Sequence, residues 1–199
     1  MTRPTVAIID GGGANIASLQ FALARLGTTG ILTVDPDVIV NASHVILPGV
    51  GAAADSMARL TRAGLIELIP GLRQPFLGIC LGLQLLYSAS EEDDATCLGV
   101  FDGKARLFES GPERAVPHMG WNRIERRRDS DLLNGIPDGS HFYFVHSYAV
   151  EVTEDTLASA DYGIPFTAIA ERGNFSATQF HPERSGKFGA QLLKNFLAR

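Results

Sequence analysis

The sequence predicts a doubly wound α/β fold, with a mostly parallel sheet, helices on both faces and antiparallel additions in the second half. Short apolar runs at residues 5–9, 31–34, 44–47 and 75–79 alternate with segments of helical periodicity. The runs are continuous and contain β-branched residues, as is typical of parallel strands buried on both faces. After about residue 95, short alternating stretches broken by Gly and Pro indicate antiparallel strands.

Helices are expected between the first strands. In the first helix, apolar residues recur at helical spacing, at Ile16, Leu19, Leu23 and Leu26. Gly27 follows as a C-terminal cap, so this helix and its two flanking strands form a βαβ unit. Further helices at residues 61–72 and 81–87 complete the doubly wound pattern.

In the second half we expect antiparallel strands, added to the same sheet, at residues 104–108, 120–126, 141–150 and 167–171. A strand at residues 176–180 and a helix at 189–197 close the chain. The 199 residues contain no internal repeat, low-complexity tract or linker, and this length suits one domain. The prediction is therefore a single domain over residues 1–199.

Composition argues against several classes of function. With 45% hydrophobic and 20% charged residues the chain resembles a soluble globular protein, and its net charge of -5 disfavours nucleic-acid binding. The basic run at residues 126–128 lies between Glu125 and Asp129, which indicates a solvated loop or strand edge. The N-terminal apolar run is too short for a signal peptide or a membrane span. The two cysteines fit neither a disulfide framework nor a zinc site, so we expect a cytoplasmic protein.

Three glycines after the first strand, Gly11 to Gly13, raise the alternative of a dinucleotide site, with Asp35 as the partner of a ribose. The pattern fails because Ile16 stands where the third glycine of G-x-G-x-x-G packs against the sheet. A tight strand-to-helix turn is the better interpretation.

The segment Gly78-Ile79-Cys80-Leu81-Gly82 reads as a strand, a G-x-C-x-G turn and a helix, which is the nucleophile-elbow arrangement with cysteine at its centre. Such a turn places its central side chain at the carboxyl end of the sheet, and the flanking glycines leave room for crowded backbone. A helix N-terminus favours the thiolate of Cys80, and the N–H of Leu81 would point at an oxyanion. A buried core cysteine is the alternative.

His181-Pro182-Glu183 supplies a base for this nucleophile and a group that orients the base. The rigid corner at Pro182 lets the imidazole and the carboxylate lie on the same side. Either residue alone would be interpreted as structural or solvated. Their occurrence together with the elbow predicts a Cys-His-Glu triad.

Leu47-Pro48-Gly49-Val50-Gly51 ends another predicted parallel strand, and ligands of open α/β sheets bind outside such ends. The N–H of Val50 or Gly51 is a candidate second oxyanion donor, with a plain turn as the alternative. His146 lies in an aromatic strand and is interpreted as a structural residue or a pocket lining rather than a second base. Cys97 lacks flanking glycines and is expected to be inert.

Together, the segments LPGVG, GICLGLQ and QFHPERSG resemble the class I glutamine amidotransferases. The resemblance implies a glutaminase in which Cys80 is the nucleophile, His181 the general base and acid, and Glu183 its orienting partner. It implies further that L-glutamine is contacted by four residues, namely Gln84, His146, Ser147 and Tyr148. Neither a metal nor an organic cofactor is required by such a reaction.

Within this family, the segments VPHMGWN and FYFVHSY and the short C-terminus after HPERSG are similar to the glutaminase subunits of imidazole glycerol phosphate synthase, an enzyme of histidine biosynthesis. That resemblance implies a (β/α)8-barrel cyclase partner that uses the ammonia. It places Asn15, Trp121 and Arg184 near the mouth that faces this partner. The turn before Asn15 departs from the family pattern, because Gly-Gly-Gly-Ala stands where relatives have an aromatic residue and a glycine.

Other functions remain as alternatives at this point. One alternative is a glutaminase whose ammonia feeds another synthase, such as anthranilate or aminodeoxychorismate synthase. Another is a non-catalytic subunit that only binds glutamine or its partner. A hydrolase of γ-glutamyl or peptide bonds fits less well, because the helix start CLGLQ is of the glutaminase type.

Overall fold

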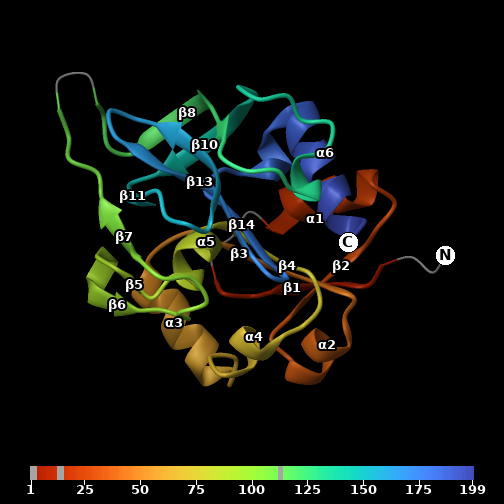
Figure 1. Ribbon diagram of the computed structural model, residues 1–199. Coiled ribbons are helices and arrows are strands. Elements are labelled where there is room, and N and C mark those ends of the chain that lie inside the picture. Colours follow the sequence, from red (N-terminus) through yellow and green to blue (C-terminus); the bar gives the residue numbers. More distant parts are fainter. Residues whose placement is uncertain (1–3, 13–15, 112–113) are drawn as a thin grey trace.

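The computed structural model describes residues 4–12, 16–111 and 114–199 and confirms the predicted fold class (Figure 1). In these ranges the main sheet runs in the order β2 (Gly30–Thr33), β1 (Val6–Ile9), β3 (His44–Gly49), β4 (Phe76–Cys80), β14 (Phe175–Thr178), β13 (Pro165–Arg172), β12 (Thr156–Asp161) and β9 (Glu125–Arg126). Neighbours from β2 to β14 pair in parallel. The remaining three strands add in antiparallel fashion, as the sequence predicted for the second half.

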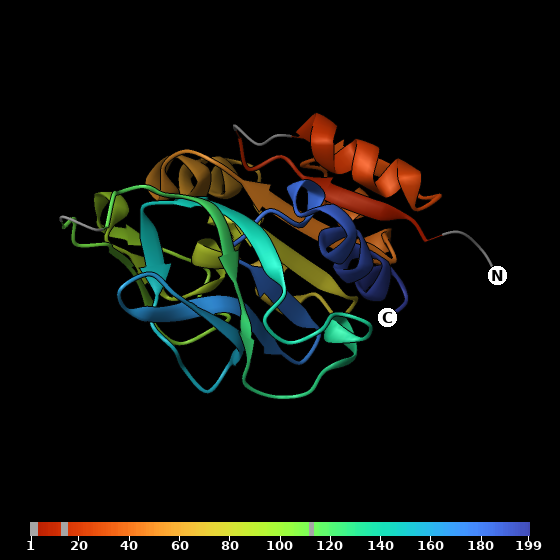
Figure 2. The same ribbon diagram turned by 90° about the horizontal axis from the view of Figure 1, so that it is seen from above.

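Helices cover both faces of the sheet (Figures 1 and 2). On one face, α1 (Ile16–Arg25) and α6 (Gly186–Leu197) lie side by side. The other face carries α2 (Pro36–Asn41), α3 (Ala53–Arg62), α4 (Leu68–Gly71) and α5 (Leu81–Leu86). Because successive strand residues point to opposite faces, Ile8 packs in the core with Leu23 and Leu192, whereas Ile9 packs in the core with Leu60. None of the described helices combines the length and hydrophobicity that crossing a bilayer requires.

Part of the second half forms two smaller sheets instead of joining the main one. The first pairs β10 (His141–His146) with β8 (His118–Arg123), and the second runs in the order β11 (Tyr148–Val150), β7 (Lys104–Leu107), β5 (Ala89–Ser90) and β6 (Ala95–Thr96). The prediction that residues 104–108 and 141–150 extend the main sheet is therefore wrong. The expected strand 141–150 breaks at Ser147, where the chain passes from one small sheet to the other. The expected strand 120–126 likewise breaks at Ile124, between β8 and β9.

Two predictions in the first half also need correction. The expected helix at residues 61–72 is wrong, because α3 ends at Arg62 and Gly64 adopts a φ of 70°, which turns the chain before the short α4. The sequence analysis did not predict α2, and Asp35 serves there as the N-cap by accepting a hydrogen bond from the N–H of Asp37 at 2.9 Å. A structural role thus accounts for the residue that suggested ribose binding.

The edges of the main sheet differ from its centre. Ile31 and Leu32 in β2 are 52% and 42% exposed, so the prediction of burial on both faces is wrong for this edge strand. The opposite edge is β9, which contains Arg126 and confirms the strand-edge interpretation of the basic run. The described ranges also hold short 3-10 helices, η1 (Glu92–Asp94), η2 (Asp131–Leu133) and η3 (Pro182–Arg184).

At the carboxyl end of the sheet, β3, β4 and α5 approach one another without room for side chains. A Cβ on Gly78 would lie 2.7 Å from the carbonyl oxygen of Gly82, and a Cβ on Gly82 would overlap the carbonyl oxygen of Leu47. In both cases the atom in the way belongs to the backbone of a buried element and not to a flexible side chain. These two glycines are therefore required by packing between elements.

The substitution Gly82→Ala should lower the free energy of unfolding by about 2 kcal/mol or more, because the backbone of β3 or α5 must shift. Gly71→Ala is the matched control, since nothing lies within 4 Å of a Cβ at that helical position. It should be neutral or stabilise the chain by about 0.5–1 kcal/mol. Urea unfolding measures both changes, and equal stability of the two variants would contradict the packing argument.

Candidate active site

Cys80 lies on a strained turn between β4 and α5. Its backbone has φ 56° and ψ -108°, a conformation that residues other than glycine rarely adopt. The side chain is 6% exposed, and Sγ lies 3.7 Å from the carbonyl oxygen of Val145. The crowding at Gly78 and Gly82 described above holds this turn from both sides. The structure thus has the elbow geometry that the G-x-C-x-G segment predicted.

The loop that follows β3 borders the same turn. In the parallel register of β3 and β4, Gly49 is paired with Cys80. A Cβ on Gly49 would come within 3.0 Å of the Cβ of Leu81, so the two segments are in close contact. Val50 and Gly51 continue from this point, and Gly51 adopts a φ of 97°. The candidate oxyanion donors Leu81, Val50 and Gly51 therefore lie together around Cys80.

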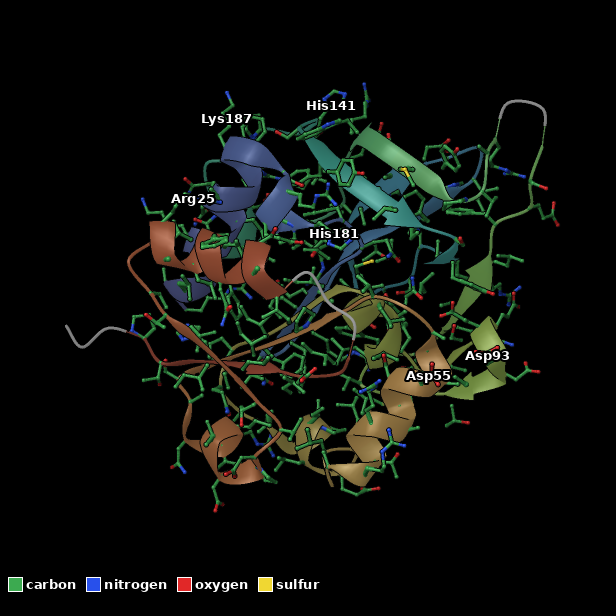
Figure 3. The ribbon with its side chains drawn as sticks, turned by 180° about the vertical axis from the view of Figure 1, so that it is seen from behind. Arg25, Asp55, Asp93, His141, His181 and Lys187 are labelled. Atoms are coloured by element: carbon green, nitrogen blue, oxygen red, sulfur yellow. The ribbon has the colours of Figure 1, made fainter. Side chains whose placement is uncertain are left out.

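His181 reaches the site from the neighbouring parallel strand. Thr178 in β14 is paired with Ile79 in β4, so the chain that leaves β14 arrives beside Cys80. His181 then precedes η3, and its Nδ1 lies 2.9 Å from Oε1 of Glu183. Both side chains are buried, with 7% and 4% of their surfaces exposed. Figure 3 shows His181 near the middle of the molecule, whereas His141 and Lys187 lie at its margin.

The surroundings of His181 favour its charged form. Burial opposes the charge, but the proximity and negative charges of Cys80 and Glu183 outweigh it and raise the pKa of His181 to about 10. Its Nε2 is buried and has no hydrogen-bond partner in the part of the chain that the structure describes. The ring is therefore held through Nδ1, with its second nitrogen left for Cys80 or a bound molecule.

A strand outside the main sheet fixes this turn. The N–H of His181 donates to the carbonyl oxygen of Tyr143 in β10 at 3.0 Å. The N–H of Tyr143 donates to Oγ of Ser185 at 3.0 Å, and the Ser185 hydroxyl donates to the carbonyl oxygen of His181 at 2.6 Å. The sequence analysis did not identify Ser185, because its contact to β10 depends on tertiary packing.

A cavity of about 370 Å³ opens beside Cys80. Its lining comes from the loop after β3, from the elbow, from η1 and from the junction of β10 and β11: Val50, Gly51, Cys80, Leu81, Gln84, Glu92, Val145, His146, Ser147 and Tyr148. A second, much smaller cavity of about 10 Å³ lies next to His181 and Glu183 and has room for about one water-sized molecule. A buried cysteine on an elbow turn, a histidine paired with a carboxylate and a cavity are thus brought together.

Residues 7–199 of the chain match the family model described as "Glutamine amidotransferase class-I". The chain belongs to the class-I glutamine amidotransferase family. Its relatives include the protein named imidazole glycerol phosphate synthase subunit HisH in Xylella fastidiosa, 50% identical over 192 residues that cover 96% of each chain. The protein of that name in Vibrio cholerae is 47% identical over 198 residues, covering 96% of this chain and 97% of the relative. The chain is therefore an enzyme of the amidotransferase class, and the resemblance to these subunits is confirmed.

Solved structures of more distant proteins share the fold. A putative GMP synthase protein from Thermoplasma acidophilum has a TM-score of 0.75 and 18% identity, covering 100% of this chain and 94% of the other. PurLQS from Thermotoga maritima has a TM-score of 0.75 and 19% identity, with 99% of each chain covered. These two comparisons concern the fold alone.

Gln84 lies on the first turn of α5 in this amidotransferase and lines the large cavity. Its Nε2 donates to the carbonyl oxygen of Tyr148 at 3.1 Å and to Oε1 of Gln179 at 3.2 Å. Gln179 in turn directs its own Nε2 at Sγ of Cys80, at 3.9 Å. Gln84 thus borders the cavity and also holds one of its walls, and Gln179 is a neighbour of Cys80 that the sequence analysis did not identify.

His146 also lines the cavity, but both of its ring nitrogens are engaged. Nδ1 lies 2.8 Å from the carbonyl oxygen of Tyr148, and Nε2 lies 2.9 Å from Nδ1 of His118. Burial lowers the pKa of His146 to about 3, so the ring is neutral at physiological pH. This agrees with the interpretation of His146 as a hydrogen-bonded lining residue. Ser147 and Tyr148 follow it along the same wall.

Glu92 is a carboxylate in the cavity that the sequence analysis did not single out. Its Oε2 accepts a hydrogen bond from the N–H of Ala53 at 2.8 Å. Burial, followed by the charge of Asp93, raises the pKa of Glu92 above its usual range. In sequence Glu92 belongs to an acidic run at residues 91–94, which reads as a solvated surface. Only the packing of η1 against α3 brings it to the cavity.

Two of the three residues predicted to face a partner, Trp121 and Arg184, lie in the described part of the chain. Trp121 in β8 is 58% exposed and lies edge-on to Tyr143, with ring centroids 6.1 Å apart. The guanidinium of Arg184 lies over the ring of Tyr143, 4.7 Å from its centroid. The structure thus brings Trp121 and Arg184 to one aromatic cluster beside the His181 turn. Asn15 lies outside the described residues, and its role remains a prediction.

The two thiols should react very differently with iodoacetamide. Both thiols are buried, but Cys80 lines a cavity. Burial raises the pKa of Cys97 to about 11, which leaves about one thiolate in a thousand at pH 8. We expect the folded chain to be alkylated at Cys80 alone, as mapped by peptide mass spectrometry, and at both thiols in urea. The variant Cys80→Ser should remain unlabelled when folded. Labelling of Cys97 at a comparable rate would contradict this assignment.

Proposed function

We propose that the chain is the glutaminase subunit of imidazole glycerol phosphate synthase, one glutaminase domain over residues 1–199 that acts in the cytoplasm. The observation that carries this proposal is the buried arrangement of Cys80, His181 and Glu183 beside a cavity of about 370 Å³. The near full-length identity to proteins named HisH supports the assignment to this synthase. Two free cysteines suit a reducing compartment.

In the proposed reaction, the thiolate of Cys80 attacks the side-chain carboxamide carbon of L-glutamine. The resulting oxyanion is stabilised by the N–H of Leu81 together with that of Val50 or Gly51. The protonated Nε2 of His181 then gives its proton to the departing nitrogen, and ammonia leaves. The product of this half-reaction is a γ-glutamyl thioester on Cys80, with His181 neutral.

The second half-reaction restores the enzyme. Neutral His181 takes a proton from a water molecule as the water attacks the thioester, and collapse of the second oxyanion releases glutamate and the Cys80 thiolate. Glu183 holds the Nδ1 side of the ring at 2.9 Å throughout, so that Nε2 performs both proton transfers. This cycle needs no metal and no organic cofactor.

The substrate is held, we infer, by polar groups that line the large cavity. Glutamine carries an α-ammonium group, and Glu92 supplies a carboxylate in the cavity lining that suits it. Gln84 contacts the same substrate, and the wall formed by His146, Ser147 and Tyr148 holds its amino-acid end. These roles assign a purpose to each polar side chain that lines the cavity.

The ammonia is passed, in this proposal, to a HisF-type (β/α)8-barrel cyclase. Trp121, Arg184 and Asn15 are the residues that we place at the contact with this partner. The exposed indole and the guanidinium stacked on Tyr143 favour such a role, because Trp and Arg are enriched in protein interfaces.

Replacing the nucleophile tests the function directly. Cys80→Ala should lower glutamine-dependent synthesis by the complex with its cyclase at least about 10⁴-fold, because no thioester can form. Synthesis from added ammonium salt should be unchanged, since the cyclase does not depend on Cys80. The control Cys97→Ala should retain both activities. Normal glutamine hydrolysis by Cys80→Ala would show that the proposed triad is wrong, and failure of the wild type to support any cyclase would refute the proposed synthase.

Neutralising Glu92 tests the substrate site. Glu92→Gln keeps an oxygen that can accept from the N–H of Ala53 but removes the charge, so KM for glutamine should rise about tenfold with a smaller change in kcat. Glu91→Gln is the matched control, because that side chain pairs instead with Lys104 at 3.9 Å. Its KM should remain within about twofold of the wild type. Steady-state glutamate release by the complex measures both values, and an unchanged KM for Glu92→Gln would refute the role of Glu92.

A further inference from the structure

A chain of hydrogen-bonded side chains connects strand β8 with the wall of the large cavity. His146 links the carbonyl oxygen of Tyr148, at 2.8 Å, to Nδ1 of His118, at 2.9 Å. Nε2 of His118 lies 3.4 Å from Nδ2 of Asn122. His118 and His146 are only 4% and 6% exposed, so water does not replace these contacts. The hydrogen-bonded series thus begins at Asn122, a partly exposed side chain of β8, and ends on the carbonyl group of Tyr148, a residue that lines the cavity.

The partners fix the direction of each hydrogen bond. A carbonyl oxygen only accepts, so Nδ1 of His146 donates to Tyr148 and Nε2 of the same neutral ring accepts. Nδ1 of His118 must then be the donor to His146, which leaves Nε2 of His118 as an acceptor. Asn122 supplies the required donor through its Nδ2. Each ring is therefore confined to one tautomer.

The amide of Asn122 cannot reverse to break this order. Its Nδ2 also donates to the carbonyl oxygen of Asp161 at 2.8 Å, and its Oδ1 accepts from the N–H of Arg123 at 2.8 Å. In a reversed amide, Oδ1 would face the carbonyl oxygen of Asp161 and Nδ2 would face the N–H of Arg123, so neither hydrogen bond could form. Backbone groups on both sides thus set the orientation of Asn122, which in turn sets the tautomers of both histidines.

Packing and burial keep the rings of His118 and His146 neutral and in place. The ring of His118 stacks on Tyr162, with centroids 4.0 Å apart, and on Phe144, with centroids 5.2 Å apart. Burial lowers the pKa of His118 to about 4 and that of His146 to about 3. At neutral pH the acceptor nitrogens are therefore unprotonated, as the hydrogen-bond order requires.

We propose that His118 and Asn122 are positioning residues for the glutamine site, which act through His146 on the backbone of Ser147 and Tyr148. This inference rests on the function proposed above. The carbonyl oxygen of Tyr148 is held by two donors, His146 and Gln84, and these approach it from β10 and from α5. Loss of the donor from β10 frees the cavity wall, while the contacts of Cys80, His181 and Glu183 remain. Substrate affinity should then suffer more than the chemical step.

Side chains along β8 face the interior and the solvent in turn, and this alternation offers matched variants for a test. His118 and Asn122 face the interior, whereas the neighbouring Arg123 is exposed and pairs with Glu125 at 2.8 Å. Arg123→Ala changes the same strand without touching the hydrogen-bonded chain, because only the backbone N–H of Arg123 contacts Asn122. It should leave KM for glutamine within about twofold of the wild type.

The decisive variants change the donor at position 118. His118→Phe keeps a stacking ring but leaves Nε2 of His146 as a buried acceptor without a partner, so KM for glutamine should rise about tenfold while kcat falls by less than about threefold. His118→Asn places an amide N–H close to the position of Nδ1, and its KM should return to within about threefold of the wild type. A merely structural role would not give this rescue.

The assay is glutamate release by the complex of the full chain with its cyclase, with ammonium-dependent synthesis as a check that each complex has assembled. Asn122→Ala should raise KM in the same direction, by about threefold, because Nε2 of His118 then lacks its donor. Unchanged KM in His118→Phe, or equal values for the Phe and Asn variants, would overturn the positioning role. If His118→Phe does not fold, an unchanged KM in Asn122→Ala overturns it alone. A wild-type complex that releases no glutamate would instead refute the proposed function itself.

Discussion

The site depends on one constraint, which is that three backbone segments meet where side chains are excluded. The carbonyl oxygen of Leu47 in β3 leaves no space for a Cβ at Gly82 in α5, and the backbone of Gly82 leaves none for a Cβ at Gly78 in β4. The chain can pass from β4 into α5 only through a sharp turn, so Cys80 takes a positive φ that the surrounding packing maintains. The backbone of Cys80, the proposed nucleophile, is thereby fixed by packing around the turn, in addition to the contacts that Sγ makes with Val145 and Gln179.

The second half of the chain completes what this turn begins. Strand β10 holds the His181 turn through Tyr143 and Ser185, and its end at His146 supplies the facing wall of the cavity. Because β10 belongs to a small separate sheet, it can cross the carboxyl end of the main sheet instead of extending its edge. At the break at Ser147 the chain passes from one small sheet to the other, and the three residues around this break line the cavity.

The sequence could predict those features whose cause is local. Glycines at fixed spacing around Cys80 and the corner at Pro182 act through the local backbone, so the elbow turn and the pairing of His181 with Glu183 could be predicted before the structure. Glu92, Gln179 and Ser185 reach the site through tertiary pairing, and nothing in their sequence neighbourhood distinguishes them from surface or core residues. The prediction of a helix at residues 61–72 was wrong although its evidence was local. The apolar spacing continues across Gly64, but this residue turns the chain.

Three buried histidines belong to the site, and their partners separate their chemistry. His146 lines the large cavity, His118 is hydrogen-bonded to His146, and His181 lines the small cavity with Glu183. Burial disfavours the charged form of each, yet the pKa of His181 rises to about 10 while those of His118 and His146 fall to about 4 and about 3. The difference lies in the groups that face the two nitrogens of each ring. His181 faces the negative charges of Glu183 and Cys80, which compensate a positive charge, whereas His118 and His146 face each other, an amide and a carbonyl, which offer no countercharge. A neutral hydrogen-bonded pair and a single protonated ring can therefore coexist at one site, and only the protonated ring has the proton that the proposed reaction transfers to the departing nitrogen.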